Sequence, residues 1–340
     1  GKNRQAIVIA SDIAKYELNS TGEYTQGAGS VSMLICENPS IISFNGSWGV
    51  STKGIGDFFK PRRIFKKSNI LIEAAKLFGK EVSSSEAEKL LNKADSKFWS
   101  DSNDFVEVYK EEPIFEGQFS NESYKERVYE AIEDFNEQNQ RDILSDWENI
   151  IFHLPYAYHG RRMIVNKWMD WMKENNQFEK IYSEIGKPNS SEDKDWIKKV
   201  SKSDIYKSFI EDKISPGEKA SSEIGNMYTA SIFMSLISSL VEAFEKDREL
   251  INKKIGFISY GSGSKAKIFE GTIQKDWIIK TKPIKLFENL DNRKRVSVDI
   301  YEKLHKRKIS SNINNNDGII KLSKISKDEF TEGLRNYIKY

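Results

Sequence analysis

The sequence predicts an α/β fold in which amphipathic helices cover buried strands. Two short apolar runs, residues 6–10 and 255–260, contain no charged residue, which is typical of strands buried on both faces of a sheet. Between them lie segments with apolar residues every three or four positions, the periodicity of helices that pack on one face. A chain of 340 residues, 38% hydrophobic and 12% aromatic, can bury a substantial core in two half-domains or one large unit.

Near the N-terminus, strands are predicted at residues 6–10, 31–36 and 41–44. The first is followed by Ser11 and Asp12, and we expect this polar pair at the strand's C-terminal end, where α/β sheets place ligand-binding residues. Gly27 and Gly29 precede the second strand and allow close approach of backbone or ligand. Glycines before a strand are not a dinucleotide-binding fingerprint, because that motif opens a helix. Residues 45–56, rich in glycine and serine, are predicted to form a loop.

Helices dominate the middle of the chain. Residues 62–111 are rich in lysine and serine, and their periodicity predicts a helical excursion with helices near 71–78 and 86–91. A helix is predicted over 120–138 with Ser120 as its N-cap. The methionine and tryptophan stripe of residues 161–175 is interpreted as core, not as a cofactor site. Two further helices are predicted at 193–213 and 225–245, the second central and buried.

The C-terminal part returns to strands. Residues 266–273 alternate in polarity and are predicted to pair antiparallel with 255–260. The remaining predicted elements are a helix at 296–305, an asparagine-rich turn at 312–317, and a hairpin of residues 319–325 with 333–340.

Composition excludes several classes of protein. The 53 basic and 51 acidic residues leave a net charge of +2, which argues against a general nucleic-acid binder. The most apolar run, residues 232–241, is too short to span a bilayer, so no membrane association is expected. Cys36 is the single cysteine; it permits neither an internal disulfide nor a multi-cysteine metal site, and it is typical of the reducing cytoplasm. No cluster of residues has the spacing of metal ligands.

Two of the three histidines, His153 and His159, lie within residues 151–163. Taken alone, His153 is better interpreted as a structural histidine that satisfies a buried carbonyl. This interpretation changes when His153 is considered together with Asp12, Asn226 and Ser262. Each of these three residues lies at the end of a predicted buried strand or at the start of a predicted buried helix. An imidazole, a carboxamide and a backbone N–H together can hold a thioester carbonyl and stabilise an oxyanion. Each is weak evidence singly, since Asn226 could be a cap and Ser262 part of a simple turn.

Five motifs in order resemble those of 3-hydroxy-3-methylglutaryl-CoA synthase. They are Ala10-Ser-Asp-Ile-Ala14 with Thr25-Gln-Gly-Ala-Gly29, Asp57-Phe-Phe-Lys-Pro61, Phe152-His-Leu-Pro-Tyr156, Gly225-Asn-Met-Tyr-Thr-Ala-Ser231 and Phe257-Ile-Ser-Tyr-Gly-Ser-Gly263. The resemblance implies a thiolase-like fold of α-β-α-β-α layers. Residues 1–61 would then be the remainder of the N-terminal half, 62–111 a helical insertion, and 112–340 the C-terminal half. In the family, a segment like Pro113-Ile-Phe-Glu-Gly117 comes soon after the Asp-Phe-Phe-Lys-Pro motif. Here residues 62–111 separate the two, and they are therefore interpreted as an insertion.

The resemblance also implies a reaction, the condensation of acetyl-CoA with acetoacetyl-CoA to 3-hydroxy-3-methylglutaryl-CoA in the mevalonate pathway. Acetyl-CoA and acetoacetyl-CoA are the expected partners, with no separate cofactor, in a cytoplasmic homodimer. By match, His153 holds the acetoacetyl group, Asn226 supports the carbonyl of the second substrate, and the Ser262 N–H polarises the acetyl thioester. The matched residues expected to line the site or contact the CoA thioester are Asp12, Asp57, Thr25, Tyr228 and Gly261.

Two departures from the family pattern modify this expectation. The family's nucleophilic cysteine and its glutamate lie before the Ala-Ser-Asp strand, and Cys36 is predicted to be buried in a strand and inert. We therefore expect the 340 residues alone not to catalyse the condensation. The family often has a lysine five residues after the histidine, where this chain has Tyr158. Arg161 and Arg162 are predicted to bind the CoA phosphates instead; an exposed arginine pair without that role is the alternative.

Two other functions stay open at this stage. Relatives in polyketide assembly perform the same condensation on substrates bound to acyl-carrier proteins. A non-catalytic acyl-CoA-binding subunit, which completes its site with a separate chain, is the other alternative.

Overall fold

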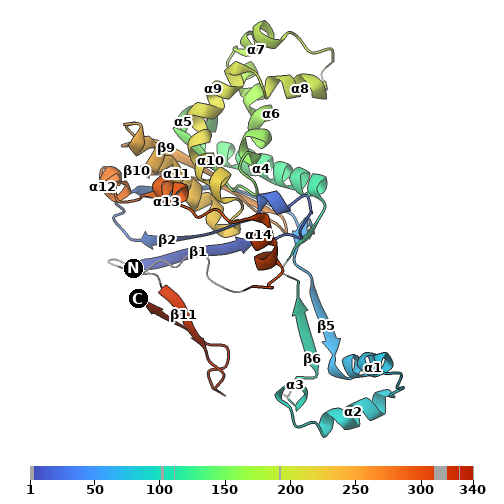
Figure 1. Ribbon diagram of the computed structural model, residues 1–340. Coiled ribbons are helices and arrows are strands. Elements are labelled where there is room, and N and C mark those ends of the chain that lie inside the picture. The colour runs from blue at the N-terminus through green and yellow to red at the C-terminus, as the bar shows by residue number, and fades with distance from the viewer. Residues whose placement is uncertain are drawn as a thin grey trace. The chain divides into compact units, whose positions relative to one another are not determined.

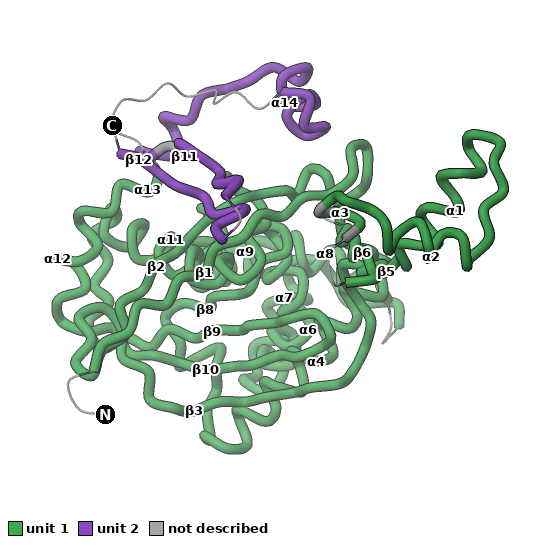
Figure 2. Tube along the Cα trace, turned by 90° about the horizontal axis from the view of Figure 1, so that it is seen from below, with its two compact units in different colours: residues 1–287 green, residues 288–340 purple. Residues whose placement is uncertain are grey.

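The computed structural model describes residues 4–100, 103–110, 112–190, 193–309, 320–328 and 330–339. The chain divides into two compact units, residues 1–287 and residues 288–340, coloured separately in Figure 2. The cavity and all of the predicted site residues belong to unit 1. The division of the sequence at residues 61 and 111 stays a prediction.

A four-stranded sheet forms the centre of unit 1. Its order is β3 (Ile42–Thr52), β10 (Lys265–Ile273), β9 (Lys254–Gly261) and β8 (Asn149–Phe152). β10 pairs antiparallel with both of its neighbours, which confirms the predicted pairing with β9, whereas β8 runs parallel to β9. All four residues of β8 are buried. This strand therefore delivers the residue that follows it, His153, from the core of the unit.

β3 is longer than the sequence predicts, because the predicted loop at residues 45–56 is a strand as far as Thr52. The glycine that suggested a loop has a packing role. A Cβ on Gly49 would lie 2.1 Å from the carbonyl oxygen of Ala131, in helix α4 (Gly117–Asn139). Glycine therefore lets the helix approach the sheet, a use of glycine in strands that composition alone does not distinguish from a turn.

Helices cover both faces of this sheet, as the alternation of β8 shows. Ile150 and Phe152 pack with α4 and α6 (His159–Glu174), whereas Ile151 packs on the opposite face with α11 (Ser231–Glu245). Such alternation is the pattern expected of a central strand. The other helices of this part of the chain are α5 (Ile143–Asp146), α7 (Phe178–Ile185), α8 (Lys194–Val200), α9 (Asp204–Lys213), α10 (Ser215–Ile224), α12 (Trp277–Thr281) and α13 (Leu286–Asp291).

Several predicted helix boundaries are wrong, and local hydrogen bonds explain them. The N-cap of α4 is Glu116, not Ser120, because the Glu116 carboxylate accepts from the N–H groups of Gln118 (3.0 Å) and Phe119 (2.5 Å). The helix predicted at 193–213 is two helices, since Ser203 caps α9 by accepting from the Tyr206 N–H. The helix predicted from residue 225 begins only at Ser231, after a 3₁₀ turn at Tyr228–Ala230.

A two-stranded ribbon lies on the other side of α11, formed by β1 (Ala6–Ala14) and β2 (Gly27–Ile35) in antiparallel register. Its inner face is buried at Val31, which packs in one cluster with Met227 and Met234. Its outer face is exposed: Ile7 is 69% and Ile9 65% accessible. The prediction that this strand is buried on both faces is therefore wrong in the structure. The succession of α4, sheet, α11 and ribbon gives unit 1 alternating α and β layers (Figure 1).

Two residues near the ribbon also differ from their predictions. Asp12 lies inside β1, opposite Gly29, and not at the strand's end. Cys36 follows β2 and is partly exposed, with its Sγ 3.5 Å from the carbonyl oxygen of Asn38. The prediction that Cys36 is buried in a strand is wrong, because β2 ends one residue before it.

The lysine-rich excursion contains strands as well as the predicted helices. The short strands β4 (Phe58–Phe59) and β7 (Ile114–Phe115) pair at its base, followed by a ribbon of β5 (Arg62–Lys66) and β6 (Phe105–Tyr109). Figure 1 shows helices at the end of this ribbon. They are α1 (Lys67–Leu77), α2 (Ser84–Asn92) and α3 (Lys97–Ser100).

Unit 2 contains α14 (Val298–His305) and a hairpin of β11 (Ile320–Ile325) with β12 (Arg335–Lys339), which confirms the predicted helix and terminal hairpin. The asparagine-rich turn predicted at 312–317 lies outside the described residues. Within the described ranges, no helix is both long and apolar enough to cross a membrane.

Candidate active site

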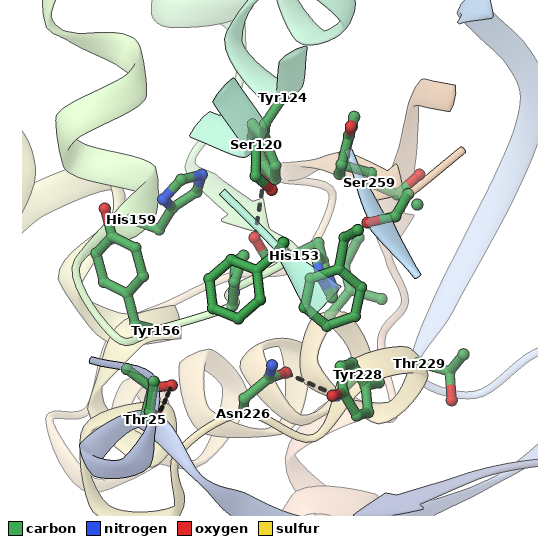
Figure 3. Close-up of a pocket in the computed structure, with 18 of the residues that line it drawn as sticks. Thr25, Ser120, Tyr124, His153, Tyr156, His159, Asn226, Tyr228, Thr229 and Ser259 are labelled. Atoms are coloured by element: carbon green, nitrogen blue, oxygen red, sulfur yellow. Dashed lines mark hydrogen bonds between the residues drawn. The ribbon is translucent and has the colours of Figure 1, made fainter. Parts of the chain in front are cut away.

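A cavity of about 680 Å³ opens where β8 and β9 end. Residues from α4, from the start of α6, from the segment before α11 and from the loop after β1 also line it (Figure 3), as do apolar residues of the β1–β2 ribbon, of β4 and β7, and of α11. Six of the ten predicted site residues line it: Thr25, His153, Asn226, Tyr228, Gly261 and Ser262. The structure thus brings together residues that are more than two hundred positions apart in the sequence. Asp12, Asp57, Arg161 and Arg162 are not among the lining residues.

His153 is held through its backbone on both sides. Its N–H donates to the carbonyl of Ile258 (2.9 Å), continuing the pairing of β8 with β9, and its carbonyl accepts from the Tyr124 hydroxyl (2.9 Å). Burial lowers the pKa of His153 to about 4. The imidazole is therefore neutral at physiological pH, and it can donate or accept a hydrogen bond but does not carry a positive charge.

His159, the first residue of α6, is a site residue that the sequence reasoning did not select. Its side chain is buried, and its ring packs edge-to-face against Tyr124 (4.3 Å between centroids) and Tyr156 (4.8 Å). Burial, and then the electrostatic repulsion that a protonated ring would meet from His153 and Arg162, lower its pKa to about 3. The scarcity of histidine in the chain and its place six residues after His153 were the only signals available in the sequence.

Asp57 fixes the glycine turn that follows β9. Its buried carboxylate accepts from the hydroxyl of Tyr260 (2.5 Å) and from the backbone N–H of Gly263 (2.9 Å). Gly261 and Ser262, which lie in this turn, line the cavity, and Asp57 itself does not. Asp57 therefore positions the turn, in place of the direct lining role that the family match suggested. Burial, and then the bond to Asp57, raise the pKa of Tyr260, so this phenol stays protonated.

Asn226 joins the two chain segments on the opposite side of the cavity. Its Oδ1 accepts from the Tyr228 N–H (2.8 Å), its Nδ2 donates to the Tyr16 hydroxyl (3.3 Å), and its own N–H donates to the carbonyl of Thr25 (2.8 Å). The capping alternative raised from the sequence is wrong, because Met227 and Ala230 hold the N-cap positions of the 3₁₀ turn and of α11; Asn226 instead lines the cavity. A second N–H of its carboxamide remains for a ligand, since Nδ2 carries two.

Glycines permit the contact between these segments. A Cβ on Gly225 would lie 2.0 Å from the carbonyl oxygen of Gln26, and one on Gly27 would lie 2.5 Å from that of Ile224. Gly225 also has a φ of +88°, a conformation that favours glycine. The close approach predicted from Gly27 is therefore an approach of backbone to backbone, which sets the position of Thr25 against Asn226.

The other predicted residues have local partners. The Thr25 hydroxyl donates to the carbonyl of Gly22 (2.7 Å), and Asp12 accepts from the Thr229 hydroxyl (3.3 Å). Tyr228 is half-buried and has a φ of +43°, with the Lys60 ammonium 5.2 Å from its ring centroid. Burial, followed by the neighbouring Tyr16, raises the pKa of Tyr228, so its hydroxyl is protonated and can donate a hydrogen bond.

The two arginines differ from each other. Arg161 forms an ion pair with the buried carboxylate of Glu218, with 2.9 Å from Nε to Oε2, and donates to the Ser215 hydroxyl (3.2 Å). Arg162 is exposed, with its guanidinium 5.5 Å from the centroid of the cavity residue Tyr156. An internal ion pair occupies Arg161, so a phosphate contact fits Arg162 better; the role of both residues stays a prediction.

Comparisons with known proteins agree with this arrangement. Hydroxymethylglutaryl-CoA synthase of Haloferax volcanii is 25% identical over 315 residues, which cover 89% of this chain and 60% of the relative, and the enzyme of Enterococcus faecalis is similar at 24% with the same 60% coverage. The chain thus spans about 60% of the length of these curated relatives.

Solved structures show the same fold. The structure of MvaS in complex with 3-hydroxy-3-methylglutaryl coenzyme A matches 99% of this chain and 68% of its own, with a TM-score of 0.68 and 21% identity. This likeness confirms the thiolase-like α/β fold implied by the motifs. The family model described as "Hydroxymethylglutaryl-coenzyme A synthase C terminal" matches residues 96–329, more than half of the sequence. The chain belongs to the hydroxymethylglutaryl-coenzyme A synthase family.

Proposed function

We propose that this chain supplies the acyl-CoA-binding part of a hydroxymethylglutaryl-CoA synthase site, for the condensation of acetyl-CoA with acetoacetyl-CoA. The observation that carries the proposal is the position of His153. Its backbone is fixed by the core, its imidazole is neutral, and it lies in one cavity with the turn that Asp57 holds. These are the groups needed to hold a thioester and a second carbonyl in place.

Four of the lining residues have a role in this proposal, together with Asp57 and Arg162. The neutral imidazole of His153 hydrogen-bonds the acetoacetyl group, and Asn226 donates its remaining N–H to a substrate carbonyl. The turn at Gly261 and Ser262 receives the thioester carbonyl, while Asp57 keeps that turn in place without touching the substrate. Arg162 is the cation available at the surface near Tyr156 for a CoA phosphate.

The nucleophile is a separate question. Cys36 is the single cysteine of the 340 residues and does not line the cavity. We expect these residues to bind acyl-CoA without forming an acyl-enzyme. Incubation with acetyl-CoA followed by mass spectrometry should leave Cys36 unmodified, and an acetylated Cys36 would contradict this expectation. The homodimer and the cytoplasmic location stay predictions.

Titration calorimetry of the 340-residue chain with acetoacetyl-CoA tests the binding proposal. Replacement of His153 by alanine should weaken binding at least about tenfold, because the hydrogen bond between the neutral imidazole and the acetoacetyl group is lost. The same replacement of His305, a histidine of unit 2, is the matched control. Wild-type affinity in the His153 variant, or no binding by the wild-type chain, would overturn the proposal.

A second substrate class is favoured by one structural relative. The Curacin biosynthetic pathway HMG synthase has been solved in complex with apo donor-ACP. Its match covers 99% of this chain and 67% of that protein's chain, with a TM-score of 0.65 and 17% identity. A carrier-protein substrate would use the same cavity for its acyl group. Titration with an acetoacetyl-loaded carrier protein, in parallel with acetoacetyl-CoA, separates the two: the proposal made above requires tighter binding of the CoA thioester.

A further inference from the structure

The cavity contains a buried polar group that the proposed function does not use. Both ring nitrogens of His159 are inaccessible to solvent, and neither has a hydrogen-bond partner among the described residues. The side chain is only 1% exposed and belongs to the cavity lining. Buried polar groups without partners are rare in folded proteins and disfavour the folded state, so a group in this position needs an explanation.

The described residues around His159 do not supply the missing hydrogen bond. Tyr124 and Tyr156 contact it through ring edges at about a right angle, and the Tyr124 hydroxyl donates to the His153 carbonyl instead. The next residue of α6, Gly160, lies against the ring of Phe152: a Cβ on Gly160 would lie 2.6 Å from that ring. Figure 3 shows the imidazole between Tyr124 and Tyr156 at the wall of the cavity. None of these contacts pairs either nitrogen, and the ring belongs to the cavity lining; because both nitrogens are closed to solvent, an oxygen in the cavity reaches them once the ring or a neighbouring tyrosine turns.

The chemistry of that partner follows from the state of the ring. The imidazole is neutral, because burial lowers its pKa far below physiological pH. A neutral imidazole carries one donor and one acceptor, which suits an uncharged oxygen and gives no advantage to a phosphate or a carboxylate. His153 and His159 both line this cavity.

We propose that His159 is a specificity-determining residue that hydrogen-bonds an oxygen of the acyl group beyond the thioester, an oxo or hydroxyl oxygen on a short acyl chain. This inference rests on the proposed function, because it assumes that the cavity holds the acyl part of a CoA thioester. It adds that the cavity selects oxygenated acyl chains over plain ones, through a side chain other than His153. A site with a hydrogen-bonding group rejects the ligand that leaves this group unpaired.

The test compares acetoacetyl-CoA with butyryl-CoA, which has the same chain length and lacks the 3-oxo group. Wild-type protein should bind acetoacetyl-CoA more tightly in titration calorimetry. In His159→Phe the ratio of the two affinities should fall about tenfold, because the phenyl ring keeps the edge contacts with both tyrosines but has no donor. His159→Gln should restore part of the ratio. An unchanged ratio in His159→Phe, or an equal loss of affinity for both ligands, overturns the inference.

A measurement on the wild-type protein covers the case in which the variants do not fold. The ¹⁵N signals of the His159 ring should shift when acetoacetyl-CoA is added and should stay in place with butyryl-CoA. Shifts of equal size with both ligands would mean that a buried water satisfies the ring, and the inference would be wrong. If the wild-type protein binds neither thioester, the proposed function itself fails; binding without discrimination overturns only the role of His159.

Discussion

The two sides of the cavity are built differently. On the core side, His153, His159 and the glycine turn belong to elements of the four-stranded sheet or to helices packed on it. On the ribbon side, Thr25 and Asn226 belong to segments that meet through glycine backbone contacts and a small apolar cluster. The core side has helices on both faces of its sheet, whereas the ribbon has an exposed outer face. The comparison indicates that the geometry of the site depends most on the few contacts of the ribbon side.

The largest expected effect is therefore at Gly225. Replacement by alanine adds a Cβ that would lie 2.0 Å from the Gln26 carbonyl oxygen at a φ of +88°. We expect a loss of about 3 kcal/mol or more in the free energy of unfolding, from the clash and the backbone strain together. Urea denaturation followed by circular dichroism measures it.

The matched control is Gly46→Ala. Gly46 has a similar φ of +78°, but an added Cβ would meet no atom within 4 Å. Strain alone should lower its stability by about 1 kcal/mol. Equal losses at the two glycines would show that the contact between the ribbon and the Asn226 segment is unimportant, and the proposed difference between the two sides would not hold.

The second effect concerns the two cavity histidines of the core side. Their pKa values in the folded protein are about 4 for His153 and about 3 for His159, below the value of 6.5 expected when the chain is unfolded. As the pH falls below 6.5 the unfolded chain binds protons that the folded chain does not, so these residues make stability decrease between pH 6.5 and about 4. At pH 5 each contributes a decrease of about 2 kcal/mol.

His159→Phe isolates one of these contributions. The variant should lose less stability than the wild type between pH 7 and pH 5, by about 2 kcal/mol, while the two proteins should respond alike between pH 7 and 8. Urea denaturation at a series of pH values provides the measurement. Parallel curves down to pH 5 would mean that the folded protein accommodates a charged imidazole at this position.

Asp57 and Asp12 offer a paired comparison of the two sides. Asp57→Asn places an amide N–H₂ among two donors, the Tyr260 hydroxyl and the Gly263 N–H, and should lower stability by about 1.5 kcal/mol. Asp12 accepts one long bond from Thr229 and one from its neighbour Ile13, so Asp12→Asn should change stability by less than about 0.5 kcal/mol.

The same pair can be assayed for ligand binding. Asp57→Asn should also weaken acetoacetyl-CoA binding, because the turn with Gly261 and Ser262 loses its anchor. Normal binding by that variant, together with a loss in Asp12→Asn, would reverse the roles assigned to the two carboxylates.

These pairs also show how far the sequence could predict the structure. Periodicity identified β9 with β10, the helices of the core and the terminal hairpin, because each pattern is local. Motif order placed His153, Asn226 and Ser262 in one site, and the cavity contains all three. The anchoring role of Asp57 was out of reach, because its partner Gly263 is more than two hundred residues away. The length of β3 was missed because Gly49 serves a helix contact that no local signal reports.

The smallest expected effect tests the exposed face of the ribbon. Ile9 on the outer face is 65% exposed and Val31 on the inner face 3%, although both are β-branched residues of the same two strands. Ile9→Thr should change the free energy of unfolding by less than about 0.5 kcal/mol. Val31→Thr should lower it by about 2 kcal/mol, because a hydroxyl is buried among Met227 and Met234 without a partner.

The comparison of Ile9→Thr with Val31→Thr is most informative if the expected difference in stability is not found. Isoleucines at positions 7 and 9, with Leu34 opposite Ile7, leave the outer face apolar and open to solvent. Surfaces of this kind are unusual on proteins that function alone. If Ile9→Thr in solution lowers stability as much as Val31→Thr, then something covers the outer face there. The ribbon side of the cavity would then be as firmly built as the core side, and the difference between the two sides would disappear.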